Sequence, residues 1–193
     1  MFLLTDPWLR PAAFSAAECD GLIGMFDASP DTTTGRLSGG AETETRICRT
    51  LWMDDTPDTA WVFRRLAELV AEVNRDAFHF DLDEFRESAQ ILSYGAPEVL
   101  SAAGPAGRYD THVDIGAGGH SASRKLSLSV QLSAADSYTG GGLQIGSSEE
   151  NWSAPREPGT AILFPSFVRH RVLPIATGTR YALVAWVHGP AFR

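Results

Sequence analysis

The chain has 193 residues, of which 44% are hydrophobic and 21% are charged, and these values are ordinary for a soluble globular protein with a sizeable core. Its formal net charge of −8 argues against nucleic-acid phosphate as the main partner, because such binding depends on clustered Lys and Arg. With only Cys19 and Cys48, no signal-peptide core and no apolar run as long as a membrane span, the sequence predicts a cytoplasmic protein without a disulfide framework.

A helix is predicted near the start of the chain. Ser15 and Glu18 have the spacing of a capping box, in which each side chain bonds to the backbone N–H of the other residue, and apolar residues follow at helical spacing up to Phe26. Residues 27–45 are rich in Thr, Gly, Ser and Asp and predict a long loop, which is interpreted either as a lid over a binding site or as a plain insertion. A short strand is predicted over residues 46–52.

A second helix is predicted after this strand. Thr56 followed by Pro57 suits an N-cap with proline at the first helical position. Apolar residues then recur from Val62 to Val73 at the spacing of an amphipathic helix, which is expected to end near Ala77. Its apolar stripe predicts that this helix covers a sheet.

The remainder of the chain consists of short strand-like runs separated by turn residues. The predicted strands are Phe78–Leu82, Glu87–Tyr94, Arg108–Asp114, Lys125–Leu132, Gly142–Gly146, Thr160–Phe164, Arg169–Pro174 and Arg180–His188. Two helices followed by these strands predict a single domain of the mainly β class with flanking helices (α+β), in which a helical part over about residues 1–78 precedes a β core over about residues 79–190. This core is expected to be a jelly roll (double-stranded β-helix) or a barrel, with the helices on one face. Ser127, Ser129 and Gln131 alternate with apolar residues, so the polar face of their strand is a candidate cavity wall.

Residues 109–116 predict a metal site. They carry an imidazole and a carboxylate two residues apart, His112 and Asp114, which point to the same face if the stretch is a strand. The alternative is a surface histidine beside a solvated carboxylate. A second such pair, His79 and Asp81, is better explained by an edge strand with one buried face.

His170 is the candidate third ligand, in a later predicted strand. With the earlier pair it would form the two-histidine, one-carboxylate facial triad of non-haem Fe(II) oxygenases, which leaves metal positions open. Arg180 opens an apolar run soon afterwards, and a buried arginine is costly unless its planar fork meets an anion such as a carboxylate. Triad and arginine together predict a site for a dicarboxylate that chelates iron. His188 is the rival third ligand, whereas His120 lies in a Gly-rich loop and is expected to face solvent.

The order of the motifs along the chain points to a family. The motifs are Tyr109, His112-X-Asp114, Arg124-Lys125-Leu126-Ser127, Gly140-Gly141-Gly142-Leu143, Pro158-Gly159, Phe164-Pro165-Ser166, His170, Pro174, Gly178, Arg180 and Trp186. Over about residues 87–190 this ordered set resembles the Fe(II)- and 2-oxoglutarate-dependent dioxygenases, and the branch it resembles most is that of the prolyl 4-hydroxylase-like proteins.

The resemblance implies roles for individual residues. His112, Asp114 and His170 match the iron ligands. Arg180 matches the arginine that pairs with the distal carboxylate of 2-oxoglutarate, and Tyr94 matches a tyrosine that lies near this co-substrate.

Five further residues are implicated in the site. Gln131 falls where relatives place a residue near the distal carboxylate of 2-oxoglutarate, and Tyr109 is expected to line the pocket wall. Arg46, Arg124 and Arg169 are candidates for contacting the prime substrate, and the alternative for each is a solvated surface charge. Arg169 stands where family members often carry an aromatic residue.

The function implied by the resemblance is hydroxylation of an unactivated C–H bond with Fe(II), 2-oxoglutarate and O2. An amino acid, a peptidyl residue or a small metabolite is the expected substrate, and neither nucleic acid nor a membrane is an expected partner. Asp114 argues against halogenation, because halogenating relatives lack this carboxylate. Two alternatives stay open: a cupin-like metal enzyme without 2-oxoglutarate, which would not need Arg180, and a jelly-roll binding module without catalysis.

Overall fold

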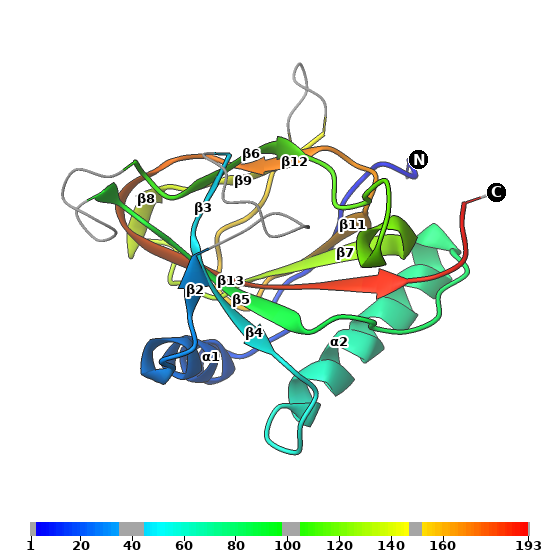
Figure 1. Cartoon of the computed structure of the whole chain (residues 1–193), viewed down its shortest axis with the longest axis horizontal. Helices are drawn as coiled ribbons and strands as arrows, with labels where there is room; N and C mark the ends of the chain where they lie inside the picture. The colour runs from blue at the N-terminus through cyan, green and yellow to red at the C-terminus, as the bar shows by residue number, and fades with distance from the viewer. Residues whose placement is uncertain (1–2, 35–44, 98–104, 147–151, 193) are drawn as a thin grey trace.

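The computed structural model describes residues 3–34, 45–97, 105–146 and 152–192, in which two antiparallel sheets face each other (Figure 1). The larger sheet has eight strands in the order β1 (Trp8–Arg10), β11 (Ala161–Pro165), β7 (Arg124–Gln131), β13 (Ile175–His188), β5 (Ala89–Gly95), β4 (Arg49–Met53) and β2 (Thr33–Thr34), with β8 (Tyr138–Gly140) paired to β13. The smaller sheet has five strands in the order β10 (Trp152–Ser153), β9 (Leu143–Ile145), β12 (His170–Val172), β6 (Arg108–His112) and β3 (Arg46–Ile47). The predicted mainly β fold with flanking helices is confirmed.

The first helix is α1 (Ala16–Ala28), and its predicted capping box is confirmed. The backbone N–H of Ser15 donates to Oε2 of Glu18 at 2.7 Å, and the backbone N–H of Glu18 donates to Oγ of Ser15 at 3.3 Å. Two backbone donors at the start of the helix are therefore satisfied by side chains.

The second helix is α2 (Ala60–Val73), which begins later than predicted. Thr56 is not its N-cap, because residues 57–59 form a turn closed by a hydrogen bond from the Thr59 N–H to the Thr56 carbonyl at 3.1 Å, and Thr59 precedes the helix instead. The helix continues into one π-helical turn, η1 (Asn74–Phe78), so helical structure ends close to the predicted residue.

The strand predicted over Phe78–Leu82 is wrong. Phe78 belongs to η1, and His79 has the left-handed backbone conformation, with φ 54° and ψ 34°. The Asn74 side chain then bonds both backbone groups of Phe80, accepting from its N–H at 2.8 Å and donating to its carbonyl at 2.9 Å. These groups are thereby bonded to a side chain rather than to a neighbouring strand, so the edge-strand explanation of His79 and Asp81 is also wrong.

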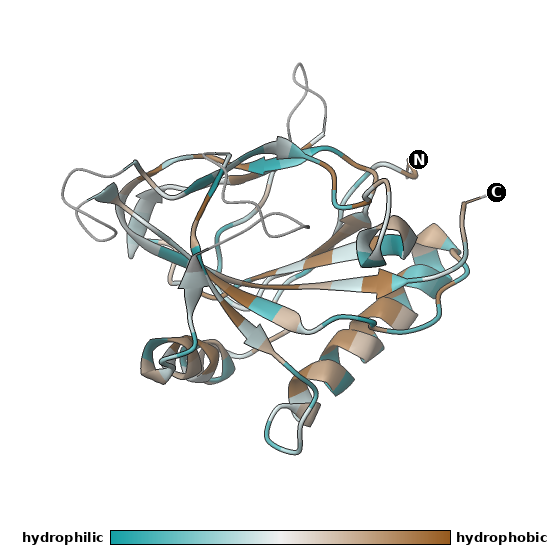
Figure 2. Cartoon of the chain, in the orientation of Figure 1, coloured by the Kyte–Doolittle hydropathy of each residue, from teal (hydrophilic) through white to brown (hydrophobic). Residues whose placement is uncertain are grey.

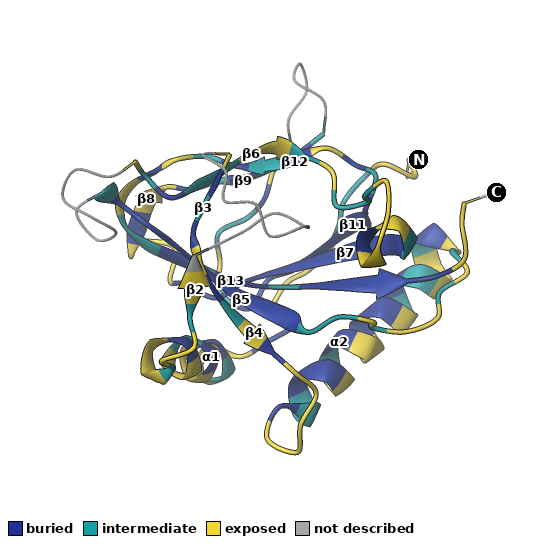
Figure 3. Cartoon of the chain, viewed as in Figure 1, coloured by how far each residue is buried: buried dark blue, intermediate teal, exposed yellow. Residues whose placement is uncertain are grey.

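The two helices cover the outer face of the larger sheet, as Figure 1 shows. The stripe predicted for α2 is buried there: Val62, Leu66 and Val73 pack in one cluster with Ile91 and Leu183 of the sheet. Burying each such side chain contributes about 1.5–3 kcal/mol. Figures 2 and 3 show the same feature as hydrophobic and buried residues concentrated on the central strands and on the sheet-facing side of α2.

The other seven predicted strands after α2 correspond to β5, β6, β7, β9, β11, β12 and β13. The main difference is that β13 begins at Ile175 instead of Arg180, because its first residues pair with the unpredicted strand β8. Within the predicted loop, Thr33 and Thr34 form β2 on the edge next to β4, and residues 35–44 lie outside the described residues, as does the lid interpretation. Among the described residues, no helix has the length and apolar character that a membrane span requires.

Gly159 lies where two parts of the fold meet closely. Its carbonyl accepts from the Phe14 N–H at 3.1 Å, its φ is +79°, and a Cβ there would lie 1.9 Å from the Phe14 carbonyl oxygen. We expect Gly159→Ala to lower the free energy of unfolding by about 1–3 kcal/mol, because of overpacking and backbone strain. Gly21 is the matched control, because it lies within α1 and a Cβ added to it would meet no atom within 4 Å.

The control substitution Gly21→Ala should raise the free energy of unfolding by about 0.5–1 kcal/mol, since alanine is the better helix former. Urea denaturation of both variants measures the difference. A Gly159→Ala protein as stable as Gly21→Ala would contradict the close approach at Gly159.

Candidate active site

A cavity of about 570 Å³ lies between the two sheets. Its floor is the inner face of the larger sheet, since alternate residues of a strand share a face. Four residues of β13 line it, namely Arg180, Ala182, Val184 and Trp186, and across the ladder from the first three stand Tyr94, Leu92 and Gln90 of β5. The floor therefore runs from a charged end at Arg180 to an aromatic end at Trp186.

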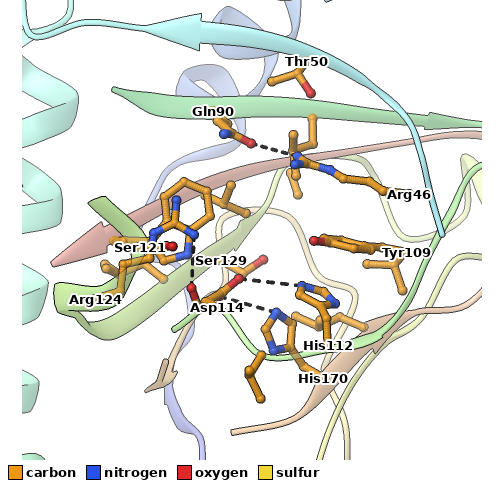
Figure 4. A pocket seen from close by; sticks show the side chains of 18 of the residues that line it. Arg46, Thr50, Gln90, Tyr109, His112, Asp114, Ser121, Arg124, Ser129 and His170 are labelled. Carbon is orange, nitrogen blue, oxygen red and sulfur yellow. Dashed lines mark hydrogen bonds and ion pairs between the residues drawn. The ribbon is translucent and has the colours of Figure 1, made fainter. Parts of the chain in front are cut away.

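His112, Asp114 and His170 meet on the wall opposite this floor (Figure 4). Their candidate ligand atoms all lie within 4.8 Å of one another. Nε2 of His112 is 3.6 Å from Oδ1 of Asp114, and Nε2 of His170 is 3.5 Å from Oδ2. Two imidazole nitrogens and one carboxylate oxygen form a donor set that can hold a divalent metal ion.

The reason for this meeting differs in part from the predicted one. The two histidines face each other because β12 and β6 pair antiparallel with His170 directly across from His112. Asp114, however, is not in a strand, because β6 ends at His112. Its backbone N–H donates instead to the carbonyl of Ser166 at 2.9 Å.

Both imidazoles are oriented by the backbone two residues before them. Nδ1 of His112 lies 2.8 Å from the carbonyl oxygen of Asp110, and Nδ1 of His170 lies 3.1 Å from that of Val168. In a neutral ring Nδ1 must carry the proton to make such a bond, which leaves the lone pair on Nε2, the atom that faces Asp114. Burial lowers the pKa of His170 and so favours the neutral form. Metal-binding histidines commonly make this outer hydrogen bond.

Aromatic rings pack against the same two imidazoles. The Tyr109 ring stacks on His112 with centroids 3.5 Å apart and planes inclined by 19°, and Tyr109 forms part of the cavity wall. The Phe164 ring contacts His170 edge-on with centroids 4.7 Å apart. Burial raises the pKa of Tyr109 to about 12, so its phenol is neutral at physiological pH.

Asp114 is ionised in this environment. Burial alone would raise the pKa of its carboxyl, but the imidazoles of His170 and His112 and the hydroxyl of Ser127 together lower it. Ser127 Oγ donates to Asp114 Oδ2 at 2.7 Å. The site therefore has one fixed negative charge between two imidazole nitrogen donors.

Arg180 is buried at the charged end of the cavity, with 1% of its surface exposed. Its Nη2 donates to Oε1 of Gln131 at 2.8 Å, and Gln131 is held by donating to the Pro155 carbonyl at 2.7 Å. No described carboxylate lies within ion-pair distance of Arg180, and its Nε has no hydrogen-bond partner among the described residues. Since an unpaired buried charge is costly, this end of the cavity suits an anion.

Tyr94 and the guanidinium of Arg180 are neighbours, with 5.6 Å between the guanidinium carbon and the ring centroid. Burial raises the pKa of Tyr94, so its hydroxyl is a neutral group that can donate or accept. The predicted group of Arg180, Tyr94 and Gln131 is thus brought together by β13, β5 and β7.

The three arginines suggested for the prime substrate have different environments. Arg46 lines the cavity, donates from Nη2 to Gln90 Oε1 at 2.8 Å, and lies over the Tyr109 ring at 5.2 Å. Arg124 also lines the cavity (Figure 4). Arg169 is exposed and is absent from the cavity lining, so the structure does not bring it to the site.

Arg124 belongs to a buried ionic cluster that the sequence did not reveal. Its Nε and Nη2 donate to the two carboxylate oxygens of Glu87, each at 2.5 Å, and its guanidinium lies 3.8 Å from the Trp186 ring centroid. His188 Nε2 is 3.1 Å from Glu87 Oε1, and His188 Nδ1 is 2.9 Å from Ser123 Oγ. His188 is therefore engaged away from the triad and is not the third histidine of the cluster, and His120 is exposed as predicted.

Comparisons with known proteins agree with this arrangement. A family model described as the 2OG-Fe(II) oxygenase superfamily matches residues 90–188. A PKHD-type hydroxylase from Hyphomonas neptunium is 33% identical over 95 residues, which are 48% of this chain and 42% of the relative. A PKHD-type hydroxylase from Crocosphaera subtropica is 40% identical over 86 residues, 44% of this chain and 39% of the relative. The matches thus span less than half of these curated relatives.

Two solved structures share the fold. A prolyl-4-hydroxylase from Pseudomonas putida superposes with a TM-score of 0.73 at 18% identity, covering 95% of this chain and 93% of that one. A prolyl hydroxylase from Trichoplax adhaerens, in complex with a hypoxia inducible factor peptide fragment, superposes with a TM-score of 0.75 at 14% identity, covering 95% and 83%. At these identities the likeness establishes the fold.

The ionic cluster predicts a specific pH dependence of stability. Burial would raise the pKa of Glu87, but hydrogen bonds from His188 and Arg124 outweigh it and lower the pKa from 4.5 to about 2. The stability contributed by ionised Glu87 is therefore complete above pH 4.5 and is lost as the pH falls toward 2. By linkage, Glu87→Gln should remove about 3 kcal/mol of stability at pH 7 and almost none near pH 2.

Denaturation curves of both proteins between pH 2 and 7 measure this difference. Glu84→Gln is the control, because Glu84 is exposed and pairs only with the exposed Arg86 among the described residues. Its curve should follow that of the wild type. If the free energy of unfolding of Glu87→Gln changed with pH in the same way as that of the wild type, the role given to Glu87 would be contradicted.

Proposed function

Because this chain belongs to the 2OG-Fe(II) oxygenase superfamily, whose family model matches residues 90–188, we propose that it is a hydroxylase dependent on Fe(II), 2-oxoglutarate and O2. Its reaction would be hydroxylation of an unactivated C–H bond in an amino acid, a peptidyl residue or a small metabolite. The PKHD-type hydroxylases among its relatives support hydroxylation as the outcome. The observation that carries the proposal is a single cavity with a two-histidine, one-carboxylate cluster on its wall and, at one end, a buried arginine without a carboxylate partner among the described residues.

The proposed iron ligands are His112, Asp114 and His170. The donor set fits Fe(II), because both histidines direct Nε2 toward one ionised carboxylate and three ligands leave positions open. Iron bound there supplies the redox chemistry that couples the oxidation of 2-oxoglutarate by O2 to substrate hydroxylation. The retained carboxylate of Asp114 argues against halogenation.

Arg180 is the proposed partner of the distal carboxylate of 2-oxoglutarate. Gln131 holds the guanidinium from one side through Nη2, while Nε has no described partner, so the guanidinium is oriented before an anion arrives. Tyr94 contributes a neutral hydroxyl beside it. A guanidinium fork that receives a carboxylate in a dry cavity forms strong, charge-assisted hydrogen bonds.

The other end of the cavity is the proposed place of the prime substrate. Tyr109 and Trp186 provide aromatic walls there, and Arg46 and Arg124 provide the charged ones. Arg124 is engaged by both carboxylate oxygens of Glu87. Arg46 donates to Gln90 and lies over the Tyr109 ring beside the triad, so it is a candidate for contacting a polar group of the substrate close to the metal site.

One experiment separates this proposal from the two alternatives. Under anaerobic conditions, Fe(II) plus 2-oxoglutarate should give a visible charge-transfer band. A cupin-like enzyme without the co-substrate, or a binding module, would give none. A screen of succinate production with amino acids, peptides and small metabolites would then identify the substrate class.

Removing a proposed ligand should remove the metal. His112→Ala and His170→Ala are each expected to abolish binding of Fe(II) and turnover of 2-oxoglutarate, because a triad with one ligand missing loses its chelating geometry. Calorimetric metal titration and succinate formation measure the two effects. His79→Ala is the control and should bind metal like the wild type, because His79 lies at the end of η1. Loss of metal in a folded His79→Ala protein, or normal turnover in a His112→Ala/His170→Ala double variant, would refute the assignment.

Removing the arginine should affect 2-oxoglutarate and spare the metal. Truncating one side of a buried, hydrogen-bonded charge pair costs about 2–5 kcal/mol, so Arg180→Ala should weaken 2-oxoglutarate binding by roughly 30- to several-thousand-fold. Arg180→Lys should be intermediate, because an ammonium keeps the charge and loses the fork. Thermal melts with and without 2-oxoglutarate test this, and a folded Arg180→Ala protein that 2-oxoglutarate stabilises as much as the wild type would contradict it.

A further inference from the structure

We infer that Ser127 and Ser166 are positioning residues for Asp114, and that they present its carboxylate to the metal ion through Oδ1 alone. The inference rests on the proposed metal site and concerns two side chains that make no contribution to the ligand set. Strand pairing does not position Asp114, because β6 ends at His112 and Asp114 lies beyond its paired residues.

The backbone at Asp114 is held by Ser166, from the turn that follows β11. The N–H groups of Asp114 and Ile115 both donate to the Ser166 carbonyl, at 2.9 and 3.0 Å. Ser166 itself is fully buried, and its own N–H donates to the Lys125 carbonyl of β7 at 3.0 Å. The larger sheet therefore fixes the position of the Asp114 backbone through Ser166.

The carboxylate is held by a relay of two hydroxyls. Ser127 Oγ donates its single proton to Asp114 Oδ2 at 2.7 Å, because an ionised carboxylate can only accept. The contact of 2.9 Å between the hydroxyls of Ser127 and Ser166 must then have Ser166 as its donor. Ser166 thus supports Asp114 twice, through its carbonyl at the backbone and through Ser127 at the side chain.

The direction of this relay distinguishes the two carboxylate oxygens. Each carboxylate oxygen lies near one histidine, Oδ1 at 3.6 Å from Nε2 of His112 and Oδ2 at 3.5 Å from Nε2 of His170. Only Oδ2 receives the Ser127 proton, whereas Oδ1 has no described hydroxyl donor and keeps all its lone pairs for the metal ion. A carboxylate that bound metal through both oxygens would occupy one of the positions that a facial triad leaves open. By engaging Oδ2, Ser127 keeps that position available to 2-oxoglutarate or O2.

The test uses three substitutions in β7 and Mn(II) as the metal probe. Ser127→Ala removes the donor, and Ser127→Thr retains a hydroxyl at the same position. Ser129→Ala is the matched control, because Ser129 is also buried, lies on the same face two residues further on, and makes no hydrogen bond to Asp114. Calorimetry gives the dissociation constant of Mn(II) for each protein, and then that of 2-oxoglutarate for each Mn(II)-loaded protein, while thermal melts without metal report folding.

We expect Ser127→Ala to weaken Mn(II) binding by about 10- to 100-fold, the usual effect of losing a hydrogen bond to a metal ligand. Its loaded form should also bind 2-oxoglutarate more weakly, because the second carboxylate oxygen can now compete for the open position. Ser127→Thr should recover most of both affinities, and Ser129→Ala should keep wild-type Mn(II) affinity.

Three results would overturn the inference in whole or in part. Wild-type Mn(II) affinity in Ser127→Ala, together with lost binding in His112→Ala, removes the positioning role and leaves the proposed function intact. An equal loss in Ser129→Ala assigns the effect to general packing. Weaker Mn(II) binding with unchanged 2-oxoglutarate affinity removes the claim that Oδ1 binds alone. Wild-type Mn(II) binding in His112→Ala would instead refute the metal site itself.

Discussion

The register between β12 and β6 is the constraint on which the candidate site depends. This pairing sets His170 directly opposite His112, so two residues far apart in sequence present their Nε2 atoms to one point. A slip of one residue would turn the His170 side chain to the other face of the sheet, because side chains alternate along a strand. The carbonyl of Asp110, in β6, and that of Val168, just before β12, then fix the two imidazole rings, so each ligand is oriented by the backbone two residues before it.

The larger sheet performs two different tasks on its two faces. Its outer face is apolar and packs against α1 and α2. Its inner face carries Arg180, Gln131 and Gln90, which lie in the cavity or hold a neighbour there. Alternation along β13 makes the division possible, because Leu183 belongs to the core while Arg180 and Ala182 line the cavity. The apolar residues buried on the outer face help to offset the cost of burying a charged group on the inner face.

Much of the site could be predicted because its residues leave short-range signals. A histidine and an aspartate two apart, and an arginine within an apolar run, are visible in any window of the sequence. The Glu87–Arg124 pair is not, since its partners are 37 residues apart and come together only because β5 and β7, which begin near these residues, lie on either side of β13. The strand predicted at Phe78–Leu82 failed for a related reason. Its apolar residues do alternate, but the Asn74 side chain bonds the backbone N–H and carbonyl of Phe80, so these groups are not available to a neighbouring strand.

The edges of the larger sheet have a consequence for association between molecules. The three residues of β1 pair with Leu163, Ile162 and Ala161 of β11, a strand in which every residue is buried, and β2 closes the opposite edge with two residues. Short edge strands offer few free backbone groups to another chain. If β1 detached, the apolar strand β11 would become an open edge with unpaired N–H and carbonyl groups, and a second molecule could add to it by β-strand pairing. The first strand of the chain therefore protects this fold from self-association, a task separate from any chemistry in the cavity.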